Sequence, residues 1–346
     1  MWLRASVMLA ASNMVAASPA GTLDAGFNGD GVALAGFNPW DASALAVLQQ
    51  PDGKIVSAGY AAPSGSENKK MVVVRYNSNG TLDTSFNGIG VLSVNMSDGI
   101  RAAAVAQQTD GKLLTAGWVR QVGSNDVLAV ARVKTNGTLD SSFGSGGVAM
   151  ADAGSASARA YAVAAHSGGS VLAAGCTNKG GAARDDFMLV SFNSSGVLDN
   201  NFGSGGGTLT DIGGGTDCAY GIIKQKDGKL VLFGESSIVR DNIASRDFGV
   251  VRYNSNGTLD KSFSGDGKTN TEFRTNDDAV ARAGIQQKDG KLVIVGSSAP
   301  LSGGNRDFAI ARYLANGSLD GSFGSGGKVR TDIAGTNDVA TGVIQQ

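Results

Sequence analysis

The side chains best suited to chemistry recur at two places in the chain. One is the residue directly after the glycine of a recurring apolar segment, and the other lies just before or at the start of a recurring Ala/Gly-rich segment. These candidates are Trp40, Asp41, Tyr60, Asp98, Trp118, Cys176, Asp217, Glu235, Asp278, Ser297 and Asp338. Aromatic rings among carboxylates suit stacking on a sugar with hydrogen bonds to its hydroxyls, or a cation held between acids. The alternative is that the acids are solvated loop residues and the indoles are half-buried packing groups.

Composition narrows the chemistry further. The chain has a single histidine, His166, so it cannot form a His-based metal cluster or a pair of catalytic imidazoles. Only 3 of the 30 acidic residues are Glu, which leaves few partners for general acid and base catalysis. The formal net charge of −1 argues against a nucleic-acid partner. The strong bias toward Asp favours turns over helices.

The two cysteines are Cys176 and Cys218. Cys176 follows a predicted second strand and Cys218 precedes the next first strand, so both are expected on one face at neighbouring positions. A disulfide would suit a secreted protein, and two buried free thiols are the alternative. Neither is expected to be a catalytic nucleophile, because His166 lies in a hairpin on the opposite face.

The elements that position these residues follow from an internal repeat. A Gly-Thr-Leu-Asp phrase recurs, with Val in place of Thr in the fourth copy and Ser in the sixth, and its intervals are 57 to 61 residues. The Asp residues of this phrase are Asp24, Asp83, Asp140, Asp199, Asp260 and Asp320. A second phrase, Gln-x-Asp-Gly-Lys, alternates with it around Asp52, Asp110, Asp227 and Asp289, with a degenerate copy at 166–170. A period of this length indicates a stack of supersecondary units.

Each unit is predicted to contain four short strands. In the first complete unit these fall near residues 44–48, 55–58, 71–76 and 91–94. Asp52-Gly53 suits a tight hairpin between the first two strands. The connection before the fourth strand carries Asp83, which is expected to cap one helical turn that aligns Leu82 with Phe86.

Repeated four-stranded units of about 59 residues predict an all-β β-propeller, with five complete blades and a partial sixth. The Ala/Gly-rich strand fits the crowded innermost position. The Asp-Gly hairpins and the Leu-Asp connections are expected on one face, and the other loops on the opposite face. The repeated Asp, Gly, Leu and Phe are interpreted as architecture. The recurrent Arg75, Arg132, Arg252 and Arg312 are expected to pair with the Asp that opens strand three or precedes strand one.

The ends of the chain carry two further expectations. Residues 1–20 read as a signal peptide, with Arg4 before a modest apolar stretch, and no segment is long enough to span a membrane. A fourth strand is expected at 31–37, and the chain stops at residues 343–346, at the end of the first strand of another blade, where the next Asp-Gly-Lys phrase should begin. We therefore expect residues 21–346 to be an incomplete propeller that continues for roughly 25 to 30 residues to finish a sixth blade, or for longer to make a seventh.

Two loops, at residues 28–31 and 264–267, superficially resemble calcium loops. Their sister copies, Gly144-Ser145-Gly146-Gly147 and Gly324-Ser325-Gly326-Gly327, lack carboxylates. Neither stretch matches a full twelve-residue calcium loop. No cofactor is therefore predicted, and calcium remains a weak alternative.

The repeat resembles the delta-60 repeat family of bacterial secreted and surface proteins. The resemblance spans residues 21–346 and includes Asp307-Phe308-Ala309-Ile310-Ala311-Arg312-Tyr313 followed by Leu319-Asp320-Gly321-Ser322-Phe323-Gly324. The third unit departs from the pattern at Gly168-Gly169-Ser170 and at Ser191, which stands where other units carry Arg. The resemblance implies a propeller in an extracellular or envelope location, and it transfers no catalytic residue.

These observations favour a non-enzymatic scaffold, adhesion or ligand-binding propeller, with a carbohydrate or a surface protein as the partner. A hydrolase or lyase using Asp carboxylates, with or without calcium, is the rival. Under that rival, replacing Asp98, Asp217 and Asp278 together would abolish activity and leave stability nearly intact. A passive spacer without a ligand is the third hypothesis.

Overall fold

Each repeat folds into one antiparallel sheet of four strands. The computed structural model describes residues 22–66, 68–96, 99–120, 125–151, 157–178, 184–240 and 243–346, so the predicted signal peptide lies outside the described residues. Within these residues there are five sheets, each with its strands hydrogen-bonded in chain order. The all-β fold and the five four-stranded blades predicted from the repeat are confirmed.

The blades are numbered here in chain order. Their strands are β1 (Trp40–Gln49), β2 (Ile55–Pro63), β3 (Lys70–Tyr76) and β4 (Val91–Val94); β5 (Ile100–Gln107), β6 (Leu113–Val119), β7 (Val127–Val133) and β8 (Val148–Ala151); β9 (Ala158–Ala165), β10 (Val171–Asn178), β11 (Asp185–Phe192) and β12 (Gly207–Thr210); β13 (Gly214–Lys224), β14 (Leu230–Arg240), β15 (Ile243–Tyr253) and β16 (Lys268–Thr271); β17 (Asp277–Gln286), β18 (Leu292–Pro300), β19 (Asp307–Tyr313) and β20 (Lys328–Thr331). A 3-10 turn, η1 (Ser167–Gly169), replaces the usual hairpin of blade three.

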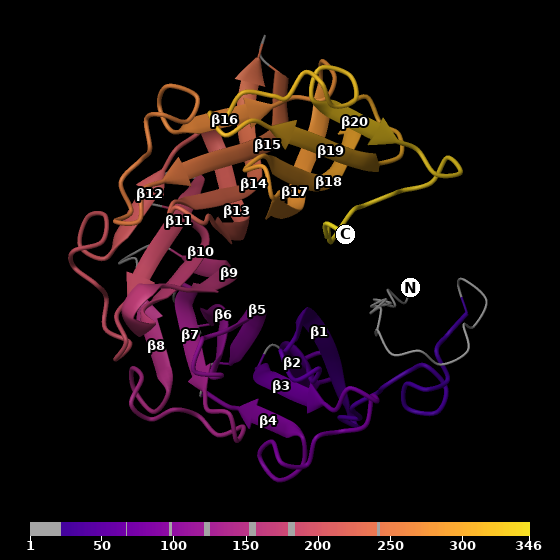
Figure 1. The fold of residues 1–346 in the computed structure, drawn as a ribbon, viewed down its shortest axis with the longest axis vertical. Coiled ribbons are helices and arrows are strands. Elements are labelled where there is room, and N and C mark those ends of the chain that lie inside the picture. Colours follow the sequence, from indigo (N-terminus) through magenta and orange to yellow (C-terminus); the bar gives the residue numbers. More distant parts are fainter. Residues whose placement is uncertain are drawn as a thin grey trace.

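The blades stand side by side around a common centre, with the first strand of each blade innermost (Figure 1). The arc is open between the indigo blade β1–β4 and the yellow blade β17–β20 (Figure 1). The hydrophobic cores lie between neighbouring blades. The core between blades one and two, for example, joins Val56 and Val73 to Leu113 and Ala131. Each blade therefore buries its faces against its neighbours, as stacked repeats do.

The two kinds of loop separate onto two faces, as predicted. The Lys of each Asp-Gly-Lys hairpin reaches the Asp of the Leu-Asp connection in the same blade. Lys54 Nζ lies 3.3 Å from Asp83, and Lys112 Nζ lies 3.2 Å from Asp140. The hairpins and the Leu-Asp connections thus share one face, which we call the hairpin face. The other end of the blades is called the site face.

Two predictions about the Leu-Asp connection are wrong. Asp83 does not cap a helical turn: its Oδ1 accepts hydrogen bonds from the amide and hydroxyl of Ser85, and the chain makes an ordinary turn to Phe86. Arg75 pairs with Asp83 rather than with an Asp beside strand one or three. The reason is geometric, because the Leu-Asp connection folds back over the end of β3, where Asp83 N donates to Arg75 O.

Residues 31–37 and 343–346 form no strand, although strands were expected there. A fourth strand pairs with the third strand of its own blade, and a first strand pairs with the second. No described strand offers residues 31–37 or 343–346 such a partner. Ala35 and Phe37 instead pack without strand pairing against Val72 and Val74 of blade one.

Candidate functional site

The site is built by an irregularity in every innermost strand. The pairing between first and second strands shifts by one residue in all five blades, which leaves one extra residue on the first strand. Such a bulge re-aims the extra side chain. The bulged residues are Leu45, Ala103, Tyr161, Tyr220 and Arg282.

A glycine of the second strand faces each bulge. At Gly117 an added Cβ would lie 2.0 Å from the carbonyl oxygen of Arg101. In the other four blades the added Cβ would lie 1.9 Å from the equivalent carbonyl oxygen of the first strand, at Gly59, Gly175, Gly234 and Gly296. The two backbones approach too closely for any side chain. The recurring Gly therefore permits the bulge, and the residue after Gly falls beside the bulged side chains.

Aromatic and guanidinium groups follow one another across all four boundaries between blades. The ring centroids of Trp118 and Tyr161 are 5.6 Å apart, and those of Tyr161 and Tyr220 are 5.3 Å apart. Arg282 Cζ lies 4.7 Å from the Tyr220 centroid. Arg101 Cζ lies 5.5 Å from the Trp118 centroid and 5.9 Å from that of Tyr60.

We call these six residues, Tyr60, Arg101, Trp118, Tyr161, Tyr220 and Arg282, the inner arc. Its four rings are half-buried, and Arg282 is exposed. Rings that keep one face accessible can stack on the apolar face of a sugar or on another flat group.

The carboxylates beside the inner arc are already paired. Glu235 accepts hydrogen bonds of 2.8 Å from the Tyr220 hydroxyl and from Arg246 Nη1. Asp278 accepts two from Arg246, at 2.5 and 2.6 Å, and one from Arg306 at 2.9 Å. Burial opposes the charged form of Asp278, but the Arg246 and Arg306 guanidiniums outweigh it and hold the pKa of this carboxyl below its ordinary value.

The same environment acts on Tyr220. Burial, followed by the negative charge of Glu235, raises the pKa of the Tyr220 hydroxyl well above its ordinary value. Tyr220 therefore stays protonated and serves as a hydrogen-bond donor to Glu235.

The other acidic candidates have structural partners. Asp217 is fully buried, and its carboxylate accepts hydrogen bonds from the amides of Ile212 at 2.6 Å and Ser237 at 3.1 Å. Asp338 repeats the first of these contacts with Ile333 N at 2.6 Å. Both residues shape the loop that leaves a blade. Replacing Asp217 and Asp278 should therefore reduce stability, in contrast to the expectation from sequence.

The remaining candidates lie as follows. Trp40 is half-buried beside the opening of the arc, with Lys70 Nζ 4.3 Å from its ring, and Asp41 is exposed next to it. Ser297 is buried, and its hydroxyl accepts a hydrogen bond from Arg306. Asp98 lies outside the described residues. The structure thus places Tyr60 and Trp118 on blades one and two of the inner arc, and Glu235 and Asp278 beside it on blades four and five. Asp217, in β13, and Asp338, after β20, instead hold the backbone of the loops that leave a blade.

A disulfide joins Cys176 to Cys218. It connects β10 of blade three to β13 of blade four, on the site face. His166 lies at the other end of blade three, beside η1, so no Cys–His pair exists among the described residues.

Sequence reasoning missed Tyr161, Tyr220 and Arg282. A signal for them exists in the repeat, because every bulged residue precedes the first residue of the Gln-x-Asp-Gly-Lys phrase, or of its degenerate copy, by five positions. Those first residues are Gln50, Gln108, His166, Gln225 and Gln287. Strict alternation along a strand would assign this position to the wrong side. Only the bulge turns it toward the inner arc.

One group of three described carboxylates is close enough to share an ion, namely Asp186, Asp211 and Asp217, whose oxygens lie within 4.8 Å of one another. Both carboxylate oxygens of Asp217 already accept hydrogen bonds from backbone amides. The two calcium-like loops are ordinary turns, in which Asp30 accepts from Val32 N and Asp266 accepts from Lys268 N.

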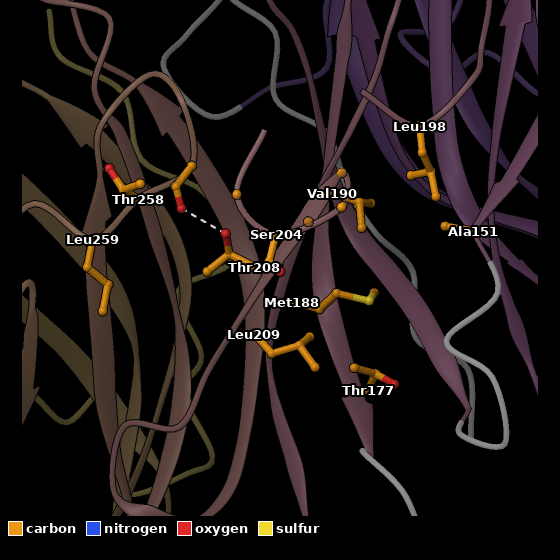
Figure 2. Close-up of a pocket in the computed structure, with 15 residues that line it drawn as sticks. Ala151, Thr177, Met188, Val190, Leu198, Ser204, Thr208, Leu209, Thr258 and Leu259 are labelled. Atoms are coloured by element: carbon orange, nitrogen blue, oxygen red, sulfur yellow. Dashed lines mark hydrogen bonds between the residues drawn. The ribbon is translucent and has the colours of Figure 1, made fainter. Parts of the chain in front are cut away.

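A separate cavity of 670 Å³ lies at the outer side of blade three (Figure 2). Figure 2 shows Met188, Val190 and Leu209 along it, with Thr208 donating a hydrogen bond to Gly257 O across one side. None of its lining residues is ionisable. The cavity therefore offers neither acid–base nor metal chemistry, and the inner arc remains the candidate site.

The fold is that of a β-propeller, and the inner arc along its innermost strands is the candidate site. A family model described as "Domain of unknown function (DUF5122) beta-propeller" matches residues 50–86, 108–143, 225–263 and 287–323. The matches fall in blades one, two, four and five. The third repeat, which carries Ser191 and the altered hairpin, is not among them.

Solved structures with a similar fold include three that differ in their printed descriptions. A protein of unknown function from Dyadobacter fermentans has a TM-score of 0.47 and 12% identity, covering 86% of this chain and 85% of its own. A GH43 endo-arabinanase from Bacillus licheniformis has a TM-score of 0.37 and 11% identity, covering 84% and 94%. Bacillus subtilis levansucrase has a TM-score of 0.37 and 10% identity, covering 88% and 86%.

No curated protein matched the sequence. Within the part of the chain that the structure describes, no helix has the length and apolar character needed to cross a bilayer.

Proposed function

We propose that this protein is a non-enzymatic, secreted or surface-exposed propeller that binds a carbohydrate chain along the inner arc. We also place it with the delta-60 repeat proteins, on the recurring Asp-Gly-Lys and Leu-Asp phrases. The observation that carries the binding proposal is the series of half-buried rings from Tyr60 to Tyr220, in which Trp118, Tyr161 and Tyr220 contact one another and Arg101 links Tyr60 to Trp118. Successive rings suit successive sugar units, because each presents a flat apolar face.

The charge arrangement favours binding over hydrolysis. A hydrolase needs two carboxyl groups whose environments separate their protonation states. Glu235 and Asp278 instead share Arg246 as a partner, and the lowered pKa of Asp278 prevents it from acting as an acid near neutral pH. The disulfide supports the extracellular part of the proposal, since such bonds persist in oxidising compartments.

The test is a titration of the purified chain with a panel of oligosaccharides, followed by the fluorescence of Trp118 and by thermal unfolding. We expect a saturable fluorescence change and a rise in Tm with the bound sugar. Tyr161→Leu should weaken binding by at least about tenfold, whereas Tyr161→Phe keeps the ring and should bind normally. Equal affinities for the two variants would contradict a stacking site.

Two controls complete the experiment. Phe323→Leu changes an aromatic group in the Leu-Asp connection of blade five, on the hairpin face, where its ring lies 4.5 Å from Arg312 Cζ, and should leave the affinity unchanged. Treatment with a chelator should also leave it unchanged, because the proposed site uses no cofactor. A loss of binding on chelation would instead favour the calcium alternative.

A further inference from the structure

The carbohydrate class follows from counting which charges near the inner arc have partners. Three of the acids are paired: Glu235 and Asp278 with Arg246, and Asp126 with Arg159 at 2.5 Å. A fourth, Asp185, is half-buried, and burial raises the pKa of its carboxyl above the ordinary value. A neutral sugar is usually held by exposed carboxylate and amide oxygens that accept from its hydroxyls. The three paired carboxylates already accept hydrogen bonds from guanidinium groups, so a neutral chain would have to compete for them.

The cations are not all paired. Arg282, Lys69 and Lys70 form no ion pair with any carboxylate of the described residues, and each lies over an aromatic ring. Arg282 sits over Tyr220, Lys69 Nζ lies 4.2 Å from the Tyr60 centroid, and Lys70 Nζ lies 4.3 Å from that of Trp40. A cation held on a ring keeps its outer side for an anion, because the ring does not neutralise the charge.

The cations and rings are also ordered along the blades. Lys69 and Tyr60 belong to blade one, Trp118 and Tyr161 occupy the middle, and Arg282 stands on blade five. A flexible chain that follows the inner arc would therefore meet positive charge near both ends and aromatic faces between them.

We propose that the ligand is an anionic polysaccharide, whose sugar faces stack on Trp118 and Tyr161 and whose carboxylate or sulfate groups pair with Arg282 and Lys69. This inference rests on the proposed function, and it specifies the substrate class for the same site. The overall net charge of −1 gives the protein no general attraction for polyanions, so the effect must come from these positions.

The experiment compares matched ligands that differ only in charge. Oligogalacturonate is measured against its methyl ester, and dextran sulfate oligomers against dextran of the same length, by calorimetric titration. We expect the charged member of at least one pair to bind at least about tenfold tighter, with an affinity that falls as salt is added. The pair that shows the difference distinguishes carboxylate from sulfate.

Variants identify the residues. Arg282→Gln should weaken the charged ligand by at least about tenfold, whereas Lys226→Gln removes an equal charge from an exposed position on the hairpin face and should have no effect. Equal losses in the two variants would mean non-specific attraction and overturn the inference.

The remaining outcomes separate the two proposals. Charged and neutral members that bind equally well would overturn the anionic ligand and leave carbohydrate binding in place. Tyr161→Leu, which keeps the charges, should then still lose affinity. No binding by any of the four ligands, under conditions in which the protein is folded, would count against both proposals.

Discussion

At the scale of single residues, the recurring Arg forms a latch between blades. Arg132 donates to Asp140 at 2.8 Å and to the carbonyl of Ser194, in the next blade, at 2.7 Å. Its guanidinium also lies 4.5 Å from the Phe143 centroid. Both charged side chains are almost fully buried, and the attraction between the two charges offsets the free energy that each loses when it leaves water.

Asp140→Asn should therefore destabilise the fold by about 3–5 kcal/mol, because it leaves the buried Arg132 without its counter-charge. Urea unfolding followed by circular dichroism measures this loss. Asp199→Asn is the matched control: Asp199 occupies the same position in blade three, where Ser191 replaces Arg. Its Oδ1 accepts a hydrogen bond from Asn201 N, and it forms no ion pair with any described residue. The control should lose less than about 1 kcal/mol. Similar losses in the two variants would refute the latch.

The same latch predicts acid sensitivity. Burial raises the pKa of Asp83, but the hydrogen bonds from Ser85 and Arg75 outweigh it and lower the pKa to about 2. Because this is below the unfolded value, the charged carboxylate contributes about 2 kcal/mol above pH 4, and the contribution is lost as the pH falls toward 2. Tm measured from pH 5 to pH 2 should drop steeply, and less steeply in Asp83→Asn. A flat profile in the native chain would contradict the prediction.

How far sequence reasoning reached at this scale depends on the kind of contact. The Asp52-Gly53 turn is local in the chain, so its sequence indicated its role. The partner of Arg75 is fixed by the fold of a connection over β3, which spacing alone does not describe. The acids of the site face were recognised by type, but Asp278 is neutralised by Arg246 from blade four and by Arg306 from a distant loop of its own blade, and neither contact follows from spacing.

At the scale of the element, the bulge in each first strand connects the repeat to the site. It turns Tyr161 and Tyr220 into the inner arc, and it requires a glycine opposite. The four strands of a blade were predictable because turn residues bound them and apolar residues fill them. The bulge was not predictable, because neither the length nor the composition of the segment shows that one of its residues is left unpaired.

Gly117→Ala should be strongly destabilising, by about 3 kcal/mol, since the new methyl would stand 2.0 Å from the Arg101 carbonyl oxygen and force β5 from β6. Thermal unfolding measures the loss. Gly321→Ala is the control, because a Cβ there meets nothing within 4 Å and other repeats carry Thr84 or Ser141 at the same place. If both substitutions are tolerated equally, the bulge does not constrain the sheet.

At the scale of the whole molecule, the boundary between blades three and four is unlike the others. Arg75, Arg132 and Arg252 each donate to a carbonyl of the next blade, but Ser191 cannot do so. This is the boundary that the Cys176–Cys218 disulfide crosses. A covalent link thus stands where the repeated ionic latch is missing. Each blade contacts only its neighbours, so the free energy of unfolding is approximately a sum over the boundaries between blades. The disulfide can therefore take the place of the Arg–carbonyl contact at this boundary.

Replacing both cysteines by Ala should therefore weaken this boundary selectively. The 42-residue separation corresponds to about 4 kcal/mol of lost chain constraint. Hydrogen exchange can locate the effect, because Gly203 N donates to Asn256 O across this boundary and Asn87 N donates to Asn136 O across the first. Exchange should accelerate at Gly203 and change little at Asn87. Equal acceleration at both amides would show that the propeller opens as one unit, and that the disulfide does not replace a local latch.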